Sequence, residues 1–149
     1  MFKVAVWLWK LANGGMEAVV MEASSHALDQ HRLDGVELNV GVFTNFTLDH
    51  LDYHNDMAEY LGAKARLVEL VVPEGTLVVN RDDPAWDQLD AGGRSVRTFA
   101  LDAEADVRAE AIRLGPRGSK FTLVIDESRR EVRLPLLARF NIENALAAA

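Results

Sequence analysis

Residues 38–80, LNVGVFTNFTLDHLDYHNDMAEYLGAKARLVELVVPEGTLVVN, decide the fold, because a strand, a helix and a second strand follow one another there. Apolar runs predict strands over 38–43 and 76–80. Between them, apolar residues recur every three or four positions and predict a helix over 56–71, with a capping box that begins at Asp56. Strand, helix and strand in this order predict a parallel α/β sheet.

The regions on either side of this stretch complete the predicted fold. Residues 17–23 predict another strand, preceded by a short helix over 6–12. After residue 96 the apolar period shortens to two, which predicts a small antiparallel meander, and a last helix is expected over 141–149. We therefore predict an α/β fold with a Rossmann-like, mostly parallel sheet and an antiparallel β meander in the C-terminal half. The predicted meander strands are 107–114, 121–125 and 131–134.

Composition excludes several classes of protein. The chain has 149 residues, 49% of them hydrophobic, which suits one globular domain with a core of its own. Lys and Arg number 16 against 23 Asp and Glu, and no basic run is present, so we expect no nucleic-acid partner. There is no cysteine, and the longest apolar run is far shorter than a membrane span. We therefore expect a soluble, cytoplasmic protein with no membrane partner.

Lys64 is the most unusual residue of the predicted helix. It lies three residues after Leu61 and four before Val68, which places it on the apolar face. A buried ammonium group is costly unless it is paired with an anion, loses its proton or is converted chemically. We therefore treat Lys64 as a candidate functional residue.

Polar residues also follow the predicted strands, where α/β sheets place their ligands. Glu22 ends an apolar run and could hold Mg²⁺, although a solvated strand end is the more common role of such a residue. His50 lies between Asp49 and Asp52 and could bind a metal or act in acid–base catalysis, but a polar loop explains these residues equally well. Arg32, two residues after Gln30, could bind a carboxylate or phosphate, or could simply be a surface arginine.

Several short motifs together resemble the Mur ligase family. The closest resemblance is to the MurE type, which adds the third amino acid to the peptide stem of peptidoglycan. The resemblance covers residues 14–149, and its motifs occur in the same order and spacing as in the family. The motifs are VMEASSHAL (20–28), Thr44-Asn45, DHLDYH (49–54), Ala63-Lys64, and Phe140-Asn141 with Asn144.

This resemblance implies an ATP- and Mg²⁺-dependent ligase. ATP would phosphorylate a carboxylate of UDP-N-acetylmuramoyl-L-alanyl-D-glutamate, and the amino group of a diamino acid would attack the acyl phosphate to form an amide. It also implies that Lys64 becomes carbamylated and faces the metal. The implied catalytic and metal-binding residues are Glu22, His50 and Lys64, the substrate-binding residues Ser24, Ser25, Gln30 and Arg32, and the nucleotide-binding residues Asn45, Asn141 and Asn144.

The resemblance also shows what the chain lacks. No Gly-Lys-Thr or Gly-Lys-Ser phosphate loop occurs, residues 1–15 match the family poorly, and the C-terminal ligase domain is missing. We therefore expect residues 1–149 to be part of a central ATPase domain that is inactive alone and monomeric at full length. The sequence does not decide between diaminopimelate and lysine as the added amino acid.

Two alternatives remain open from the sequence. One is a sibling ligase such as folylpolyglutamate synthase, which the SSHAL and DHLDYH motifs disfavour. The other is a metal-binding remnant, either inert or hydrolytic, that uses Glu22, His50 and His54.

Overall fold

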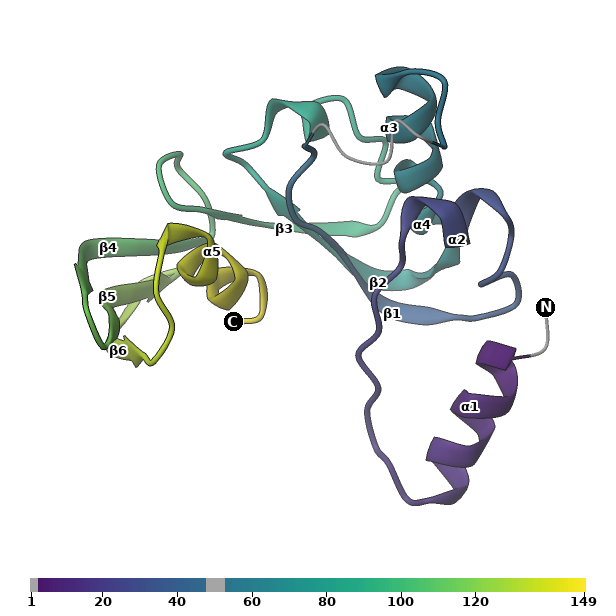
Figure 1. Cartoon of the computed structure of the whole chain (residues 1–149), viewed down its shortest axis with the longest axis horizontal. Coiled ribbons are helices and arrows are strands. Elements are labelled where there is room, and N and C mark those ends of the chain that lie inside the picture. The colour runs from purple at the N-terminus through teal and green to yellow at the C-terminus, as the bar shows by residue number, and fades with distance from the viewer. Residues whose placement is uncertain (1–2, 48–52) are drawn as a thin grey trace.

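The computed structural model describes residues 3–47 and 53–149, which form one six-stranded sheet with the strand order β1-β2-β3-β4-β5-β6 (Figure 1). In this part of the chain, no helix is long and apolar enough to cross a bilayer. The strands are β1 (Leu38–Phe43), β2 (Val71–Asn80), β3 (Ser95–Ala100), β4 (Val107–Gly115), β5 (Gly118–Ile125) and β6 (Ser128–Leu134). The helices are α1 (Lys3–Asn13), α2 (Ser25–Asp29), α3 (Met57–Ala65), α4 (Leu67–Leu70), the 3-10 turn η1 (Pro84–Trp86) and α5 (Arg139–Ala147).

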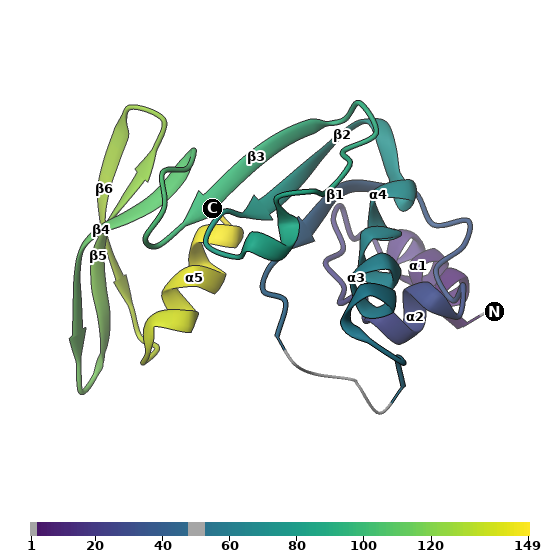
Figure 2. The ribbon, with the colours of Figure 1, turned by 90° about the horizontal axis from the view of Figure 1, so that it is seen from above.

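Strands β1 to β4 pair in parallel, and β4, β5 and β6 pair antiparallel. The predicted fold class is therefore confirmed, including the meander in the C-terminal half. Strand β3 joins the two parts, since it pairs with β2 on one side and with the first residues of β4 on the other. Figure 2 shows the meander and α5 at one end of the molecule and α1 to α4 at the other.

The parallel part of the sheet is covered by α2 and α4. Leu28 of α2 and Val68 of α4 pack with Phe43 of β1 and Leu77 of β2 in one buried cluster. These residues are buried because the apolar stripe of each helix meets the apolar face of the strands. This first core fixes the helices that carry most of the predicted site residues.

The predicted helix over 56–71 is present but is divided at Arg66. Asp56 caps α3, its side chain accepting a hydrogen bond from the backbone N of Glu59 at 2.8 Å. The helical turns end at Leu70, because Val71 already pairs with Leu38 of β1. The boundary thus moves one residue, and the β-branched Val71 joins the sheet.

The predicted strand over 17–23 is wrong, because this segment forms no ladder with the sheet. Its alternation is nevertheless visible in the burial of its side chains: Met21 and Ala23 pack against the first core, while Glu22 is exposed and Val20 is 99% exposed. Alternation reports which side chains face the core, whereas a strand also needs a neighbour for its backbone. Among the residues that the structure describes, β1 pairs with β2 alone.

A second core lies between the meander and α5. Phe99 of β3 and Phe121 of β5 pack with Ile142 and Leu146 of α5. Gly118 makes the β4–β5 turn possible, since its φ is +131° and a Cβ at this position would lie 2.3 Å from the carbonyl oxygen of Leu134. The predicted last helix is confirmed in kind and begins two residues earlier than expected.

The loop between β3 and β4 is held by one carboxylate. Asp82 follows β2, and its two oxygens accept hydrogen bonds from the backbone N atoms of Leu101 at 2.5 Å and Ala103 at 2.8 Å. The N of Asp102 also donates to it, at 3.2 Å. Three successive amides around one anion form a compact nest that joins the two cores.

Candidate functional site

The candidate site lies where α2 meets α3, next to the segment that follows β1. Five rings form a connected group there. The ring centroids of His26 and Tyr53 are 4.0 Å apart, those of Tyr53 and His54 4.8 Å, and those of His54 and Tyr60 5.2 Å. Phe46, just beyond β1, stacks on Tyr60 at 4.7 Å. The two helices and the strand end are thus held together by aromatic contacts.

Two side chains at this site, one of them in the ring group, are buried without hydrogen bonds in the described part of the chain. Ser25 and His54 are each 1% exposed, and neither the Ser25 Oγ nor either ring nitrogen of His54 has a partner there. Buried polar atoms are normally satisfied by protein, water or a ligand. Within the described residues, these three buried side-chain atoms therefore have unused capacity to bind a polar group.

The predicted substrate residues lie on and around α2. Ser24 caps the helix, its Oγ accepting from the backbone N of Ala27 at 3.3 Å. Gln30 ends it, and its Nε2 donates to the Tyr53 hydroxyl at 3.1 Å. Arg32 is exposed. The structure therefore brings Ser24, Ser25 and Gln30 onto one short helix, with Arg32 two residues beyond the helix C-cap.

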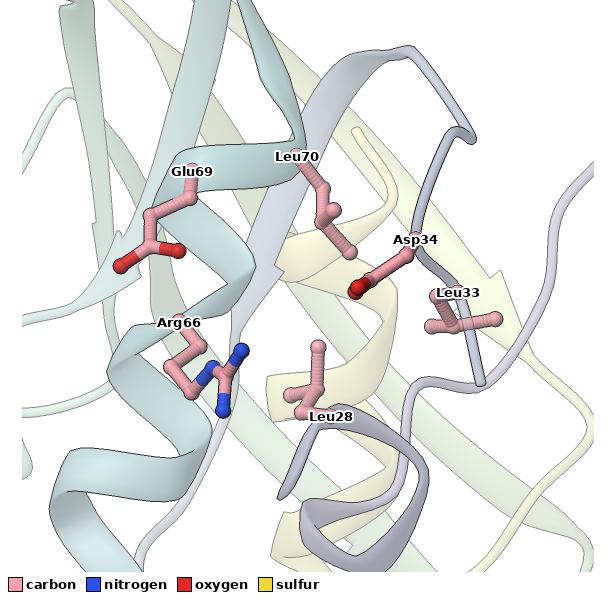
Figure 3. A pocket seen from close by; sticks show the side chains of 6 residues that line it. All are labelled: Leu28, Leu33, Asp34, Arg66, Glu69 and Leu70. Carbon is pink, nitrogen blue, oxygen red and sulfur yellow. The ribbon is translucent and has the colours of Figure 1, made fainter. Parts of the chain in front are cut away.

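A small cavity lies between α2, α4 and the loop that follows α2 (Figure 3). Arg66 donates from Nη2 to Nδ1 of His31 at 2.9 Å, which joins the end of α3 to the loop between Gln30 and Arg32. The cavity holds about 20 Å³, which is room for about one water molecule. It is too small for a substrate. Its lining residues are Leu28, Leu33, Asp34, Arg66, Glu69 and Leu70.

Of the three predicted metal ligands, two are described. Lys64 is half-buried on α3, and its Nζ lies 5.2 Å from the centroid of the Tyr60 ring, next to the unsatisfied His54. Glu22 is exposed in the segment before α2. His50 lies outside the described residues. Within residues 3–47 and 53–149, no three His, Cys, Asp or Glu side chains are grouped to hold a metal ion.

The predicted nucleotide residues fall into two places. Asn45 is exposed directly after β1, and its position is fixed on both sides: Trp86 donates from Nε1 to the Thr44 carbonyl at 3.2 Å, and the Asp83 carboxylate accepts from the Phe46 backbone N. This segment lies at the carboxyl ends of the parallel strands, where α/β sheets bind ligands.

Asn141 and Asn144 lie on α5 instead, which packs against the second core. Asn141 donates from Nδ2 to the Leu137 carbonyl at 2.6 Å, while Asn144 is exposed. A hydrogen bond of 2.6 Å from Asn80 at the end of β2 to Glu143 ties α5 to the same carboxyl edge of the sheet. The structure thus places Asn141 and Asn144 away from α2 and α3, on a helix that contacts the carboxyl edge of the same sheet.

Sequence reasoning missed the part played by Tyr53. Its hydroxyl accepts from Gln30 and donates to Asp29 at 2.7 Å, so it positions the end of α2. From the sequence, His54 has a role only in a metal-binding remnant, either inert or hydrolytic, yet it is the buried centre of the ring group. The signal that could have found both is their place beside His50 in a dense polar run.

A family model described as the Mur ligase middle domain matches residues 3–149. The UDP-N-acetylmuramoyl-L-alanyl-D-glutamate--2,6-diaminopimelate ligase of Xanthomonas campestris pv. campestris (strain 8004) is 48% identical over 147 residues, 95% of this chain and 30% of that protein. The protein of the same name from Geobacter sulfurreducens is 46% identical over 145 residues, 93% of this chain and 28% of that protein. The chain therefore spans about 30% of the length of these relatives.

Solved structures agree with the sequence relatives. A structure titled UDP-N-acetylmuramoyl-L-alanyl-D-glutamate--2,6-diaminopimelate ligase superposes with a TM-score of 0.76 at 34% identity, covering 85% of this chain and 27% of that chain. A crystal structure of MurF from Acinetobacter baumannii gives a TM-score of 0.65 at 25% identity, with 74% and 24% covered. The fold of the matched part of the chain is therefore similar to that of both proteins.

Proposed function

Since the chain belongs to the Mur ligase family, we propose that the complete protein is a MurE-type ligase, which joins 2,6-diaminopimelate to UDP-N-acetylmuramoyl-L-alanyl-D-glutamate with the use of ATP. The observation that carries this proposal is 48% identity over 147 residues to a ligase of that name. The added amino acid, which the sequence left open, is taken from the names of the relatives. The protein acts in the cytoplasm and as a monomer.

The proposed reaction has two steps. The D-glutamate carboxylate of the substrate attacks the terminal phosphate of ATP, so that ADP leaves and an acyl phosphate forms. The amino group of diaminopimelate then attacks the acyl carbon, loses a proton and displaces inorganic phosphate, leaving an amide. Both steps depend on holding charged groups in line and on offsetting their charge.

The residues of α2 and its flanking loop serve the nucleotide-linked dipeptide. Arg32 is exposed, and its planar guanidinium can bind a carboxylate or phosphate through two parallel hydrogen bonds. Ser24 and Ser25 lie side by side at the start of the helix, and the buried Oγ of Ser25 has unused hydrogen-bonding capacity. Gln30 is held in place by Tyr53. Asn45, Asn141 and Asn144 serve the nucleotide from the carboxyl edge of the sheet.

Mg²⁺ belongs to the proposal because ATP chemistry of this kind uses it to offset phosphoryl charge. The described residues alone do not make a magnesium site, since they contain no group of three suitable side chains. The proposed ligands are Glu22, His50 and Lys64. An ammonium group cannot ligate a cation, whereas a carbamylated Lys64 would present oxygens, which Mg²⁺ prefers. No step of the reaction above is derived from the metal.

The direct test is to purify the complete protein and measure phosphate release and amide formation from ATP, the UDP-linked dipeptide and either diaminopimelate or lysine. We expect turnover with diaminopimelate. Lys64→Ala should lower kcat by about a hundredfold or more, because charge stabilisation at the reacting phosphate is lost. The matched control is Lys10→Ala on α1, which should leave kcat unchanged. Turnover with lysine alone would refute the diaminopimelate assignment.

Lys64→Arg separates the carbamate role from a simple need for positive charge. Arginine keeps a cation at this position but does not form the carbamate. We expect Lys64→Arg to be as inactive as Lys64→Ala, with the same midpoint of thermal unfolding as the parent protein within a few degrees. Normal turnover by Lys64→Arg would refute the carbamate.

The 149 residues alone should not turn over ATP. They contain no Gly-Lys-Thr or Gly-Lys-Ser sequence, and a loop of that type supplies the backbone amides and the lysine that hold the phosphates. The test is phosphate release by this chain with ATP and Mg²⁺, with and without the dipeptide substrate. Sustained release well above the rate in buffer would contradict this part of the proposal.

A further inference from the structure

The meander carries an uneven distribution of charge on its outer face, the face opposite α5. On this face, directly paired residues of β4, β5 and β6 lie in cross-strand rows. Inward residues such as Phe121 pack under α5, so the residues that alternate with them point outward. The three rows, from β3 toward the β4–β5 turn, are Arg108-Val124-Arg129, Glu110-Thr122-Glu131 and Arg113-Lys120-Arg133.

The first two rows balance each other. Arg129 forms an ion pair with Glu110, and Arg108 pairs with Glu104 and reaches Glu110 at 4.0 Å. The Arg129 guanidinium holds the pKa of the Glu110 carboxyl below its usual range. Two arginines are thus matched by two glutamates at this end of the sheet.

The third row is not balanced. Arg113, Lys120 and Arg133 are directly opposed across three strands, an arrangement that destabilises a sheet when the charges have the same sign. In the part of the chain that the structure describes, Arg113 and Lys120 form no ion pair, and neither does Arg117 in the neighbouring turn. Arg133 reaches Glu131 at 3.4 Å, and both of these side chains are about 70% exposed.

A β-bulge places the third cation in this row. The register of β4 against β5 shifts between Glu110 and Arg113, and Ala111 has a φ of +51°. The extra residue turns Ile112 inward to the second core and brings Arg113 opposite Lys120. Without the bulge, Ile112 would occupy that place. Bulges often redirect a side chain next to a functional site.

The row borders an open groove at the β4–β5 turn with a volume of about 540 Å³. This size lies within the range of small-molecule sites, roughly 300–1,000 Å³. Leu114 and Leu134 of its lining pair with Ser119 and alternate with the cations, so the groove runs around the end of the hairpin from the cationic row to the opposite face. Its lining residues are Arg113 to Lys120 and Arg133 to Pro135, and the apolar ones are Leu114, Pro116, Leu134 and Pro135.

We propose that this groove binds a small ligand with two adjacent phosphate groups. Neighbouring strands lie about 5 Å apart, so the three cations span roughly 10 Å. A diphosphate spans more of this row than a single phosphate does, so it contacts the three cations with less bending of their side chains. Two of the cations are arginines, whose fork suits phosphate oxygens. The row is separate from the residues proposed for the ligase function, because α2 and α3 lie at the other end of the molecule and α5, with Asn141 and Asn144, packs on the opposite face of the meander (Figure 2).

The test is a titration of the 149-residue chain with inorganic pyrophosphate at low ionic strength, followed through backbone amide NMR signals. We expect saturating shifts at residues 113–120 and 133, and at least about tenfold weaker binding of orthophosphate. Lys120→Gln should weaken pyrophosphate binding by about fivefold or more. Arg97→Gln is the control, since Arg97 is an exposed arginine on β3 paired with Asp126, and it should change binding by less than about twofold.

Three results would overturn the proposal. The first is the absence of NMR shifts at residues 113–120 with about 10 mM pyrophosphate, a concentration on the order of the weakest useful affinities. The second is that Arg97→Gln weakens pyrophosphate binding as much as Lys120→Gln does. The third is that orthophosphate binds as tightly as pyrophosphate. A second measurement checks the electrostatic premise without ligand. Lys120→Gln should keep or raise the midpoint of thermal unfolding at low salt, because it removes like-charge repulsion. A clear fall in that midpoint would contradict the premise.

Discussion

The parallel part of the sheet and the meander obtain their strand partners in different ways. In the meander each strand pairs with the next one along the chain across a tight turn, as Gly115 does with Gly118. In the parallel part, Leu38 pairs with Val71 and Thr76 with Ser95, so a helix or a long loop separates the partners. A local partner is always present in the meander, whereas a parallel strand depends on a distant segment. Residues 17–23, which have no such partner, stay outside the sheet.

The largest effect should come from the strand that joins the two regions. Phe99 of β3 is fully buried in the second core, so Phe99→Ala should lower the free energy of unfolding by about 3–5 kcal/mol. Urea denaturation followed by circular dichroism measures this. Val96→Ala on the same strand, where Val96 is 46% exposed, should cost much less. Equal losses for the two variants would show that β3 is not the joint between the cores.

Hydrogen exchange should show the contrast between the two regions directly. The amides of residues 17–23 form no ladder, so they should exchange at least about a hundredfold faster than those of β5, which bond to strands on both sides. Amide exchange in D₂O, read by NMR, gives these rates residue by residue. Protection of residues 18–22 equal to that of β5 would mean that this segment has a partner in solution.

A smaller effect is expected at the start of the meander, where Asp106 accepts hydrogen bonds from the Thr98 backbone N at 2.7 Å and the Thr98 hydroxyl at 2.8 Å. These bonds hold the pKa of the Asp106 carboxyl below its ordinary value. The stability that they contribute is therefore present above about pH 4 and is lost as the pH falls further through the lowered pKa.

Asp106→Asn should thus lower the free energy of unfolding by about 1–2 kcal/mol at pH 7 and by less at pH 3. Denaturant melts at the two pH values measure the difference. Asp126→Asn is the control, because Asp126 is an exposed partner of Arg97 and should change stability by under about 0.5 kcal/mol. A loss that is the same at both pH values would argue against the hydrogen-bonded carboxylate.

The smallest expected effect has the opposite sign. Ala111 has a left-handed φ of +51° in the bulge, which glycine adopts more easily. Ala111→Gly should raise the free energy of unfolding by about 0.5–1 kcal/mol, whereas Ala109→Gly in the same strand should lower it. Thermal melts of both variants decide this. If Ala111→Gly destabilises as much as Ala109→Gly, the bulge is not strained.

The meander and the helix caps could be predicted from sequence because their signals are local. Two-residue alternation between turn residues places β4 to β6, and the Asp56 cap begins α3 where expected. The predicted strand over 17–23 is wrong because its pairing would have to be long-range. Alternation reports the environment of the side chains but carries no information about a backbone partner far away in the chain. Strand β3 was not predicted either, because its long-range pairing with β2 leaves no local signal.

In the candidate site, too, local relations could be predicted from the sequence and long-range contacts could not. Ser24, Ser25 and Gln30 were grouped through the family resemblance and lie close together in the sequence, whereas the helix α2 that carries them was not predicted. The contact of Tyr53 with Gln30 spans 23 residues, and the tie between Asn80 and Glu143 spans 63, so neither could be read from spacing. The pairing of Arg113 with Lys120 was hidden by the bulge, because ordinary alternation would have placed Ile112 there.

The amide nest of Asp82 has a consequence for how this fold can vary in length. Because one carboxylate is bound by three consecutive amides, from Leu101 to Ala103, a residue inserted within that run would break contacts that link the two cores. The turn at Asp126 and Glu127 lies at an exposed hairpin tip, where Asp126 contacts Arg97 and the Asp106 carbonyl but binds no run of successive amides. Insertions, affinity tags or a transplanted domain should therefore be tolerated at residues 126–127 and rejected at 101–103.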